Sequence, residues 1–163
     1  MRLNIRKEES EKMNKYVVMS WQRKSHILYK KRFKILPRLI QFAIRIICGC
    51  SIPPSVIIGE GTRFAHNGLG CIIHDECIIG RETVIQGNVV LGGKNGEKGP
   101  LIGTYCYIGA GACVLGEIKI GDDAMIGANA VVLHDVEPGA VVVGVPAQKV
   151  KMVDKKLIGR MKQ

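Results

Sequence analysis

Aliphatic residues recur at every sixth position over much of the chain. Two runs keep this spacing without a slip, Ile73, Ile79, Ile85 and Leu91, and then Ile102, Ile108, Val114, Ile120, Ile126 and Val132. Glycine often follows the aliphatic residue, and a small residue often stands two positions before it. A period of six fits neither a helix nor a simple strand alternation. It predicts a solenoid in which a short strand and a turn form one side of a prism.

Three such hexapeptides would close one coil of the prism. The aliphatic side chains would stack between coils, and glycine would occupy the corners, where the Cβ of any other residue would clash. The pattern resembles that of hexapeptide-repeat proteins, and the resemblance implies an all-β fold, the left-handed parallel β-helix, for residues 51–136. The small residues Cys71, Cys77 and Cys106 are then expected inside the prism as apolar residues.

Two interruptions of the repeat predict surface loops. Phe64 and Ile73 stand nine residues apart, so the segment 66–70 carries three extra residues. Leu91 and Ile102 stand eleven apart, which leaves residues 93–100 as a protruding loop. Insertions in a solenoid lie on the surface and often carry function. Beyond residue 136 we expect a short C-terminal cap and a basic tail, residues 137–163.

Residues 1–50 have a different pattern, a basic helical one. Residues 16–33 mix apolar and basic residues at loose helical spacing. An apolar stripe follows, made of Leu36, Leu39, Ile40, Ala43, Ile44 and Ile47, with Arg38, Gln41 and Arg45 on the opposite face. The segment holds 13 basic and 3 acidic residues, whereas residues 51–163 hold 11 of each.

Two interpretations of this basic segment stay open, and they can coexist. The stripe can cap one end of the β-structure or pack against a sister subunit. Alternatively, residues 16–48 make a peripheral contact with an anionic membrane, at about 1 kcal/mol of attraction per basic residue. The apolar stretch 35–48 is too short to cross a bilayer, which takes about 20 residues.

Composition narrows the function classes. A chain of 163 residues with 47% hydrophobic and 5% aromatic residues is one domain with an aliphatic core, which excludes disorder. The six cysteines form no CxxC pair and no signal peptide opens the chain, so we expect a cytoplasmic protein. No nucleic-acid partner is expected, because the basic segment lacks a groove-reading or base-stacking motif. A non-catalytic solenoid that binds acidic membrane or nucleic acid through its basic arm stays as the alternative.

Residues 52–150 resemble the serine O-acetyltransferase branch of the hexapeptide acyltransferases. The matching pieces are Ile58-Gly59-Glu60-Gly61, a glycine-flanked His66, Leu91-Gly92-Gly93, Ile108-Gly109-Ala110-Gly111-Ala112, Ile126-Gly127-Ala128-Asn129-Ala130 and Val143-Gly144-Val145-Pro146-Ala147. The segment Ala65-His66-Asn67-Gly68-Leu69-Gly70 is similar to short members of this branch that are encoded with surface-polysaccharide genes and acetylate sugars.

The resemblance implies a homotrimer with acetyl-CoA as co-substrate in the groove between adjacent prisms. His66 stands at the position of the family's essential histidine. An imidazole, whose unperturbed pKa is about 6.5, can remove a hydroxyl proton as the oxygen attacks the thioester, without a covalent enzyme intermediate. No metal is expected, because a zinc site would need three converging histidines and the spacing offers none.

The resemblance also implies the remaining contacts. Ala110, Gly111, Ala128, Leu133 and His134 fall where the family approaches the pantetheine and the nucleotide. Lys149 and Lys151 are candidates for the CoA phosphates, because Gln148 departs from the basic residue that the family often has there. Asn67, Lys94 and Asn95, in the two interruptions of the repeat, are the candidate acceptor contacts.

The acceptor is the least determined part of this interpretation. Three pieces of the serine-specific pattern are missing: the chain has Ser51-Ile52-Pro53-Pro54 for the Asp-Ile-His-Pro entry, Ala65 for the Asp before the histidine, and Lys98-Gly99-Pro100-Leu101-Ile102 for the loop with a second histidine. A site for free serine would normally pair its ammonium and carboxylate with charged partners. We therefore expect a carbohydrate hydroxyl, a surface-polysaccharide precursor, as acceptor, with serine as the alternative.

Overall fold

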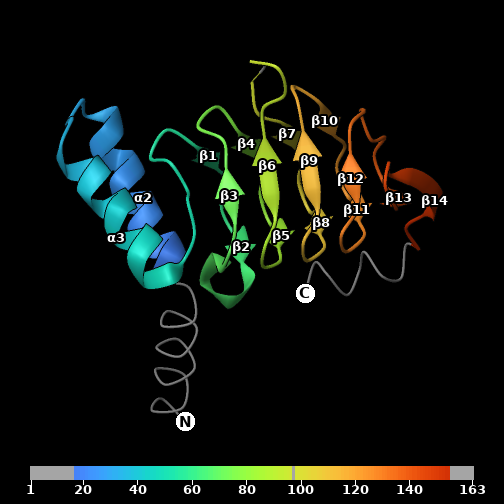
Figure 1. Cartoon of the computed structure of the whole chain (residues 1–163), viewed down its shortest axis with the longest axis horizontal. Helices are drawn as coiled ribbons and strands as arrows, with labels where there is room; N and C mark the ends of the chain where they lie inside the picture. Colours follow the sequence, from blue (N-terminus) through green and yellow to red (C-terminus); the bar gives the residue numbers. More distant parts are fainter. Residues whose placement is uncertain (1–16, 97, 155–163) are drawn as a thin grey trace, which may run out of the picture.

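The computed structural model describes residues 17–96 and 98–154, and these form a β-solenoid preceded by two helices (Figure 1). The helices are α2 (Val17–Lys30) and α3 (Leu36–Cys48). The strands are β1 Ile57–Ile58, β2 Arg63–Phe64, β3 Ile72–Ile73, β4 Ile78–Ile79, β5 Val84–Ile85, β6 Val90–Gly92, β7 Leu101–Ile102, β8 Tyr107–Ile108, β9 Cys113–Leu115, β10 Lys119–Ile120, β11 Met125–Ile126, β12 Val131–Val132, β13 Ala140–Val143 and β14 Gln148–Met152.

Three sheets form the sides of the prism. The first sheet has the order β1-β4-β7-β10, the second β2-β5-β8-β11-β13 with β14 at its edge, and the third β3-β6-β9-β12. Each coil contributes one strand to each sheet, and all strands up to β13 pair in parallel. The parallel β-helix expected from the period of six is confirmed.

Stacked aliphatic side chains fill the prism, as the repeat predicts. In the second sheet, Phe64, Ile85, Ile108, Ile126 and Val142 stand in register, and each is at most 5% exposed. The small residues two positions earlier in each hexapeptide are also buried, among them Cys71, Cys77, Thr83, Cys106, Ala112, Ala124 and Ala130. Burying one large aliphatic side chain is worth roughly 1.5–3 kcal/mol, so this stack is the main source of stability.

The two interruptions appear as protrusions from the coils. Ile102 and Ile120 pair at the regular separation, whereas Ile58 pairs with Ile79 and Ile79 with Ile102 across longer coils. The first insertion forms a short 3-10 helix, η1 (Ala65–Gly68), after the second sheet. The second is the loop 93–100, which follows the third sheet. The two insertions therefore leave the prism at opposite ends of the strands of the third sheet (Figure 1).

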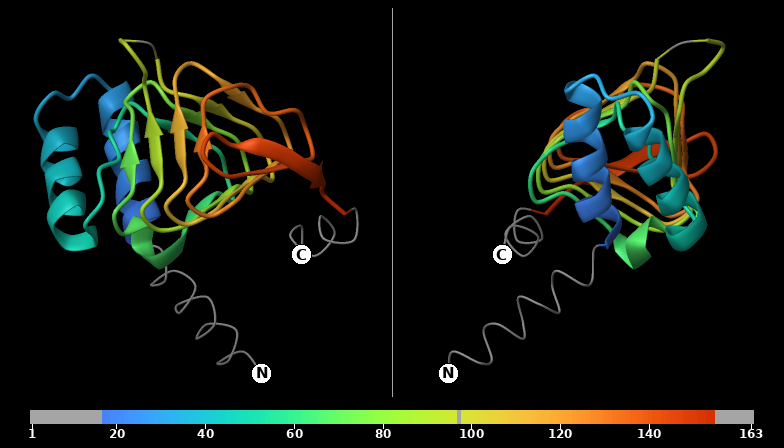
Figure 2. Two further views of the ribbon diagram at one scale, coloured as in Figure 1. Left: turned by 45° about the vertical axis from the view of Figure 1, so that its right-hand side comes forward. Right: turned by 90° about the vertical axis from the view of Figure 1, so that its left-hand side faces the viewer.

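Helix α2 caps the open N-terminal end of the solenoid (Figure 2). The amide of the buried Gln22 donates to the carbonyl of Val56 at 3.1 Å, which supplies a partner for a backbone group of the first coil. Nδ1 of His26 donates to the carbonyl of Pro54 at 2.7 Å. Val18 and Met19 are buried with these residues. The end of the solenoid is therefore covered by α2, and not by the apolar stripe of residues 36–47 for which a capping role was considered.

Helix α3 packs less deeply than its apolar stripe suggests. Of the stripe, only Ile44 is buried, whereas Leu36, Leu39 and Ile47 are exposed. Arg38 and Arg45 are exposed, as expected for the opposite face. The helix ends at Gly49, whose left-handed backbone (φ 65°) suits glycine. Among the described helices, none is long and apolar enough to span a bilayer.

The C-terminal end of the solenoid is closed by a hairpin. Strand β13 continues the second sheet, and β14 returns antiparallel to it. The N–H of Val153 donates to the carbonyl of Gly139 at 2.7 Å and ties down the end of β14. Strands β13 and β14 lie within the segment 137–163 for which we expect a cap and a basic tail, and residues 155–163 of that segment lie outside the described part of the chain.

Candidate functional site

His66 lies in η1, on the left-handed backbone that the first insertion requires. His66, Asn67 and Gly68 have φ of 51°, 54° and 74° in succession. Left-handed residues other than glycine are uncommon and cost of order 1–3 kcal/mol each, so the surroundings must hold them. Two hydrogen bonds do so, from Gly70 N–H to the carbonyl of Gly49 (2.9 Å) and from Cys71 N–H to the carbonyl of Gly68 (2.8 Å). This turn leaves the His66 side chain exposed at the corner of the first coil.

Asn67 contributes a buried polar atom beside His66. Its Oδ1 is buried and has no hydrogen-bond partner within the described chain. Its backbone carbonyl accepts a weak hydrogen bond from the thiol of Cys50, with the sulfur at 3.8 Å. A buried acceptor without a donor is costly, which makes this oxygen a natural contact for a donor on a bound molecule.

The corner that carries His66 continues through the later coils. Backbone hydrogen bonds connect it coil by coil: Asn88 N–H to the carbonyl of Leu69 (2.8 Å), Gly111 N–H to that of Gly87 (3.0 Å), and Asn129 N–H to that of Ala110 (2.8 Å). Three of the predicted cofactor residues, Ala110, Gly111 and Ala128, therefore lie on the same edge of the prism as His66. Their small side chains leave the backbone of this edge accessible.

The other predicted residues lie elsewhere on the chain. Lys94 and Asn95 belong to the loop that follows the third sheet, and Leu133 and His134 follow the same sheet two coils later. His66 precedes that sheet. A single copy therefore does not bring the candidate acceptor residues Lys94 and Asn95 together with His66. This separation could have been found in the sequence. Because three hexapeptides make one coil, the place of a hexapeptide within its group of three tells which edge of the prism its turn lies on.

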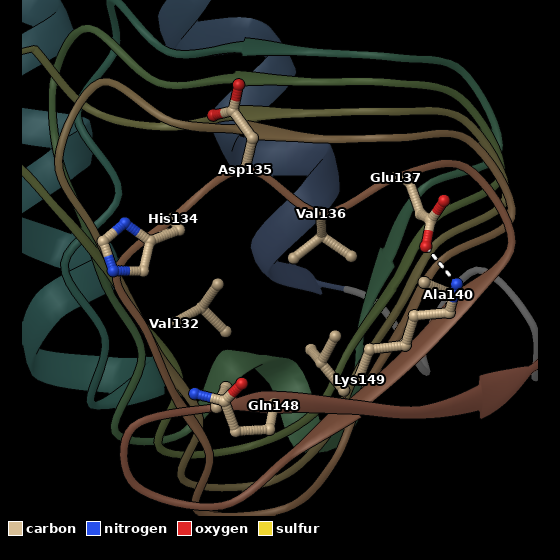
Figure 3. Close-up of a pocket in the computed structure, with 10 residues that line it drawn as sticks. Val132, His134, Asp135, Val136, Glu137, Ala140, Gln148 and Lys149 are labelled. Carbon is tan, nitrogen blue, oxygen red and sulfur yellow. Dashed lines mark hydrogen bonds and ion pairs between the residues drawn. The ribbon is translucent and has the colours of Figure 1, made fainter.

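His134 lines a hollow at the C-terminal end of the solenoid, of about 310 Å³ (Figure 3). Gln148 and Lys149 of β14 line it from the other side, with Glu137. Figure 3 shows the ammonium of Lys149 directed to the carboxylate of Glu137, with which it forms an ion pair. Lys149 is therefore partly neutralised, while Lys151 is exposed on the same strand and does not line the hollow.

The cysteines are poor candidates for nucleophiles. All six are free thiols, and all except the half-buried Cys113 are buried. Burial raises the pKa of Cys50, Cys77 and Cys106 to about 12. Because the thiolate is the reactive form, these side chains stay neutral and unreactive at physiological pH.

One cluster that the sequence analysis did not single out is His74, Asp75 and Glu76. Their potential ligand atoms lie within 4.8 Å of one another, which is close enough to share a cation. However, Nδ1 of His74 already accepts the N–H of Glu76 (3.3 Å), and the three residues are consecutive in the chain, with His74 half-buried and Asp75 and Glu76 exposed. Nothing else in the described chain directs them toward a ligand.

Comparisons with known proteins identify what this arrangement is similar to. The family described as bacterial transferase hexapeptide (six repeats) matches residues 99–134. A serine acetyltransferase of Helicobacter pylori is 40% identical over 131 residues, which are 78% of this chain and 76% of that protein. One of Synechococcus elongatus is 38% identical over 129 residues, 77% of this chain and 52% of that protein. The chain thus spans about half of the cyanobacterial relative.

The solved structures agree with the sequence relatives. A serine acetyltransferase of Brucella abortus in complex with coenzyme A superposes with a TM-score of 0.80 at 29% identity, and the match covers 83% of this chain and 55% of that one. The expected enzyme class, an acyltransferase of the serine O-acetyltransferase branch, is confirmed by these matches.

The expectation of a carbohydrate acceptor is wrong. Curated relatives at about 40% identity over most of the chain are serine acetyltransferases, so the findings favour the serine alternative. The expectation rested on three short departures, at residues 51–54, at Ala65 and at residues 98–102. Those pieces are short compared with the 131 residues over which the Helicobacter pylori enzyme matches. The absence of three short serine-specific motifs was therefore a poor basis for predicting the acceptor.

Proposed function

Because the chain belongs to the serine acetyltransferase family of hexapeptide-repeat transferases, we propose that it transfers the acetyl group of acetyl-CoA to the hydroxyl of L-serine. The observation that carries this proposal is the 40% identity with a serine acetyltransferase of which the chain covers 76%. The exposed His66, on a turn that two backbone hydrogen bonds hold, supplies the required base.

His66 acts as the general base. As the serine oxygen attacks the thioester carbon, the hydroxyl proton passes to the imidazole. The C–O bond forms, the C–S bond breaks, and the proton passes to the departing sulfur, so that O-acetylserine and CoA leave. General-base catalysis of this kind contributes about 10²–10⁴-fold in rate. The buried, neutral cysteines support direct attack rather than a thiol intermediate.

Acetyl-CoA, the co-substrate, lies along the edge that His66 begins. Ala110, Gly111 and Ala128 leave room there for an extended chain against the backbone. Leu133, His134, Lys149 and Lys151 are proposed contacts for the nucleotide end. Lys149 must share its charge between Glu137 and a phosphate, so Lys151 carries more of that interaction.

The working form is a homotrimer. His66 and the loop with Lys94 and Asn95 lie on opposite edges of the third sheet in one copy. A neighbouring copy would set one edge against the other and complete the site. Lys94, with its positive charge, then suits the serine carboxylate, and Asn67 and Asn95 supply amide groups to the acceptor. The six free thiols favour a reducing compartment such as the cytoplasm.

The experiment measures the rate at which the purified chain releases free thiol from acetyl-CoA, with and without L-serine. We expect release that depends on serine, and a fall in kcat/KM of about 10²–10⁴-fold for His66→Ala. Glu82→Ala is the matched control, because Glu82 is another exposed corner residue with a left-handed backbone (φ 53°), on the edge between the first and second sheets. Serine-independent release, or equal rates for His66→Ala and wild type, would contradict the proposal.

A further inference from the structure

Helix α3 presents an apolar face to the surface of the molecule. We define this α3 apolar face as the side chains of Leu36, Leu39, Phe42, Ile46 and Ile47, which are 46%, 57%, 62%, 66% and 64% exposed. Phe33 and Ile35, in the linker from α2, are exposed as well. The left-hand view of Figure 2 shows α3 on the outer side of the helical pair, with α2 between it and the solenoid. Contiguous apolar surface of this kind marks an interaction site in most soluble proteins.

The charged residues that border the α3 apolar face are all basic. Among residues 17–50 there is no Asp or Glu, and eight side chains are basic: Arg23, Lys24, Lys30, Lys31, Arg32, Lys34, Arg38 and Arg45. Of these, Arg23 lines a hollow with Glu60 and Glu82 of the solenoid instead. Arg38 and Arg45 lie two helical turns apart, on one side of the face. On the other side, Lys24 lines a groove between the helices together with Leu39 and Ile40.

A basic hollow of about 770 Å³ adjoins the N-terminal end of α3. Lys30, Arg32, Lys34 and Arg38 line it together with one carboxylate, that of Asp75. The start of α3 adds unpaired N–H groups and no acidic residue. Arginine in particular binds phosphate groups through paired hydrogen bonds, so the hollow suits an anionic headgroup.

We infer that α3 docks on an anionic lipid surface, lying in the plane of the membrane with its apolar face in the acyl boundary and its basic border on the headgroup phosphates. The helix has 13 residues and is about 20 Å long, which is too short to cross a hydrocarbon core of about 30 Å. Strong amphipathicity with basic residues beside the apolar side chains is typical of helices that lie at such an interface.

Charge favours lipid over a second copy of the chain as the occupant. Two copies that met through the α3 apolar face would bring two basic borders together. Residues 17–50 contain no carboxylate that could pair with these basic side chains. Like charges opposed at an interface are unfavourable, whereas an anionic leaflet attracts each basic residue.

The docked helix adjoins the loop of His66. The N–H of Gly70 donates to the carbonyl of Gly49 at the end of α3 (2.9 Å), and Leu69 lies against Gly49. Leu69 and Ile72 are themselves exposed, so the apolar surface continues from α3 toward the corner of the candidate active site. Membrane docking would therefore hold this corner of the enzyme close to the lipid surface.

The test is flotation of the full-length chain with lipid vesicles of phosphatidylcholine, with or without about 30% phosphatidylglycerol, at low and high salt. We expect binding to the anionic vesicles that weakens at high salt. Phe42→Ser with Ile46→Ser should lower the partition coefficient about a hundredfold or more, because it removes two buried side chains. Arg38→Gln with Arg45→Gln should lower it about tenfold to thirtyfold.

Matched controls separate this surface from a general loss of apolar or basic residues. Val150→Ser with Met152→Ser removes exposed apolar residues from β14, and Arg63→Gln with Lys119→Gln removes exposed charges from the solenoid. Both controls should float as wild type does. Molar mass by light scattering and serine-dependent thiol release check that every variant is folded. Absence of wild-type flotation, unchanged flotation of both α3 variants, or a smaller oligomer for Phe42→Ser with Ile46→Ser would overturn the inference, the last because a second copy would then cover the face.

Discussion

The solenoid and the helical pair in front of it use aliphatic side chains in opposite ways. In the solenoid, each aliphatic repeat residue points inward and meets its counterpart in the next coil, as Ile85, Ile108 and Ile126 do. On α3, Leu39, Phe42 and Ile46 point outward. The two regions also differ in charge. Residues 51–163 hold equal numbers of basic and acidic residues, whereas all charged residues among 17–50 are basic. The solenoid is therefore built to pack on itself, whereas α3 is built to meet a surface outside the chain.

The largest difference in the free energy of unfolding should appear when one isoleucine of the solenoid and one of α3 are each replaced by alanine. Ile108→Ala leaves a cavity in the middle of the stack and should lower the free energy of unfolding by about 2–5 kcal/mol. Ile46→Ala, on the exposed side of α3, should change it by less than about 0.5 kcal/mol. Urea denaturation followed by circular dichroism measures both. Equal losses for the two variants would break the comparison.

The junction between the regions is the next place to test. Gln22→Ala removes the donor to the Val56 carbonyl and leaves that group of the first coil without its partner. The expected cost is about 1–3 kcal/mol in the free energy of unfolding. Gln41→Ala, at a half-buried position on α3, is the control and should cost less. If Gln22→Ala is as stable as the control, the helical pair does not cap the solenoid through this contact.

Gly111 tests how closely the corners of the solenoid are fitted. Both Gly111 and Gly96 have positive φ, 71° and 83°, so Gly→Ala strains the backbone at each. A Cβ on Gly111 would also lie 2.1 Å from Oδ1 of Asn129, whereas one on Gly96 meets nothing within 4 Å. Gly111→Ala should therefore cost about 1 kcal/mol more than Gly96→Ala in thermal or urea unfolding. Combining it with Asn129→Ala should recover much of the difference.

Buried thiols give no pH-dependent difference at neutral pH, and their effect on stability appears only as the pH rises. Because burial raises the pKa of Cys50, Cys77 and Cys106 to about 12, the folded state favours the neutral thiol. This stabilisation is complete below the unfolded-state pKa of about 8.5 and is lost as pH rises from there toward 12. The melting temperature should therefore fall between pH 8 and pH 11 more steeply in the wild type than in Cys106→Ala. Parallel curves would contradict the assignment.

Much of the solenoid could be predicted from the sequence, because a period of six has one packing solution. The aliphatic residues from Ile73 to Val132 and the two insertions follow from spacing alone. The burial of α3 could not be predicted, since an apolar stripe does not say what covers it. The left-handed turn at His66 could not be predicted either, because it depends on a hydrogen bond from Gly70 to Gly49 in a distant segment. The acceptor was misjudged because three short motifs were weighed against the similarity of the whole chain.

The most direct test of the central claim is to detect the product bond. The purified chain is incubated with acetyl-CoA and L-serine, and the methylene protons of serine are followed by NMR. We predict their conversion to those of O-acetylserine in the wild type and in Glu82→Ala, and no conversion above background in His66→Ala within the same time. Unacetylated serine with the wild type, or equal conversion by His66→Ala, would contradict an enzyme that uses this histidine to acetylate serine.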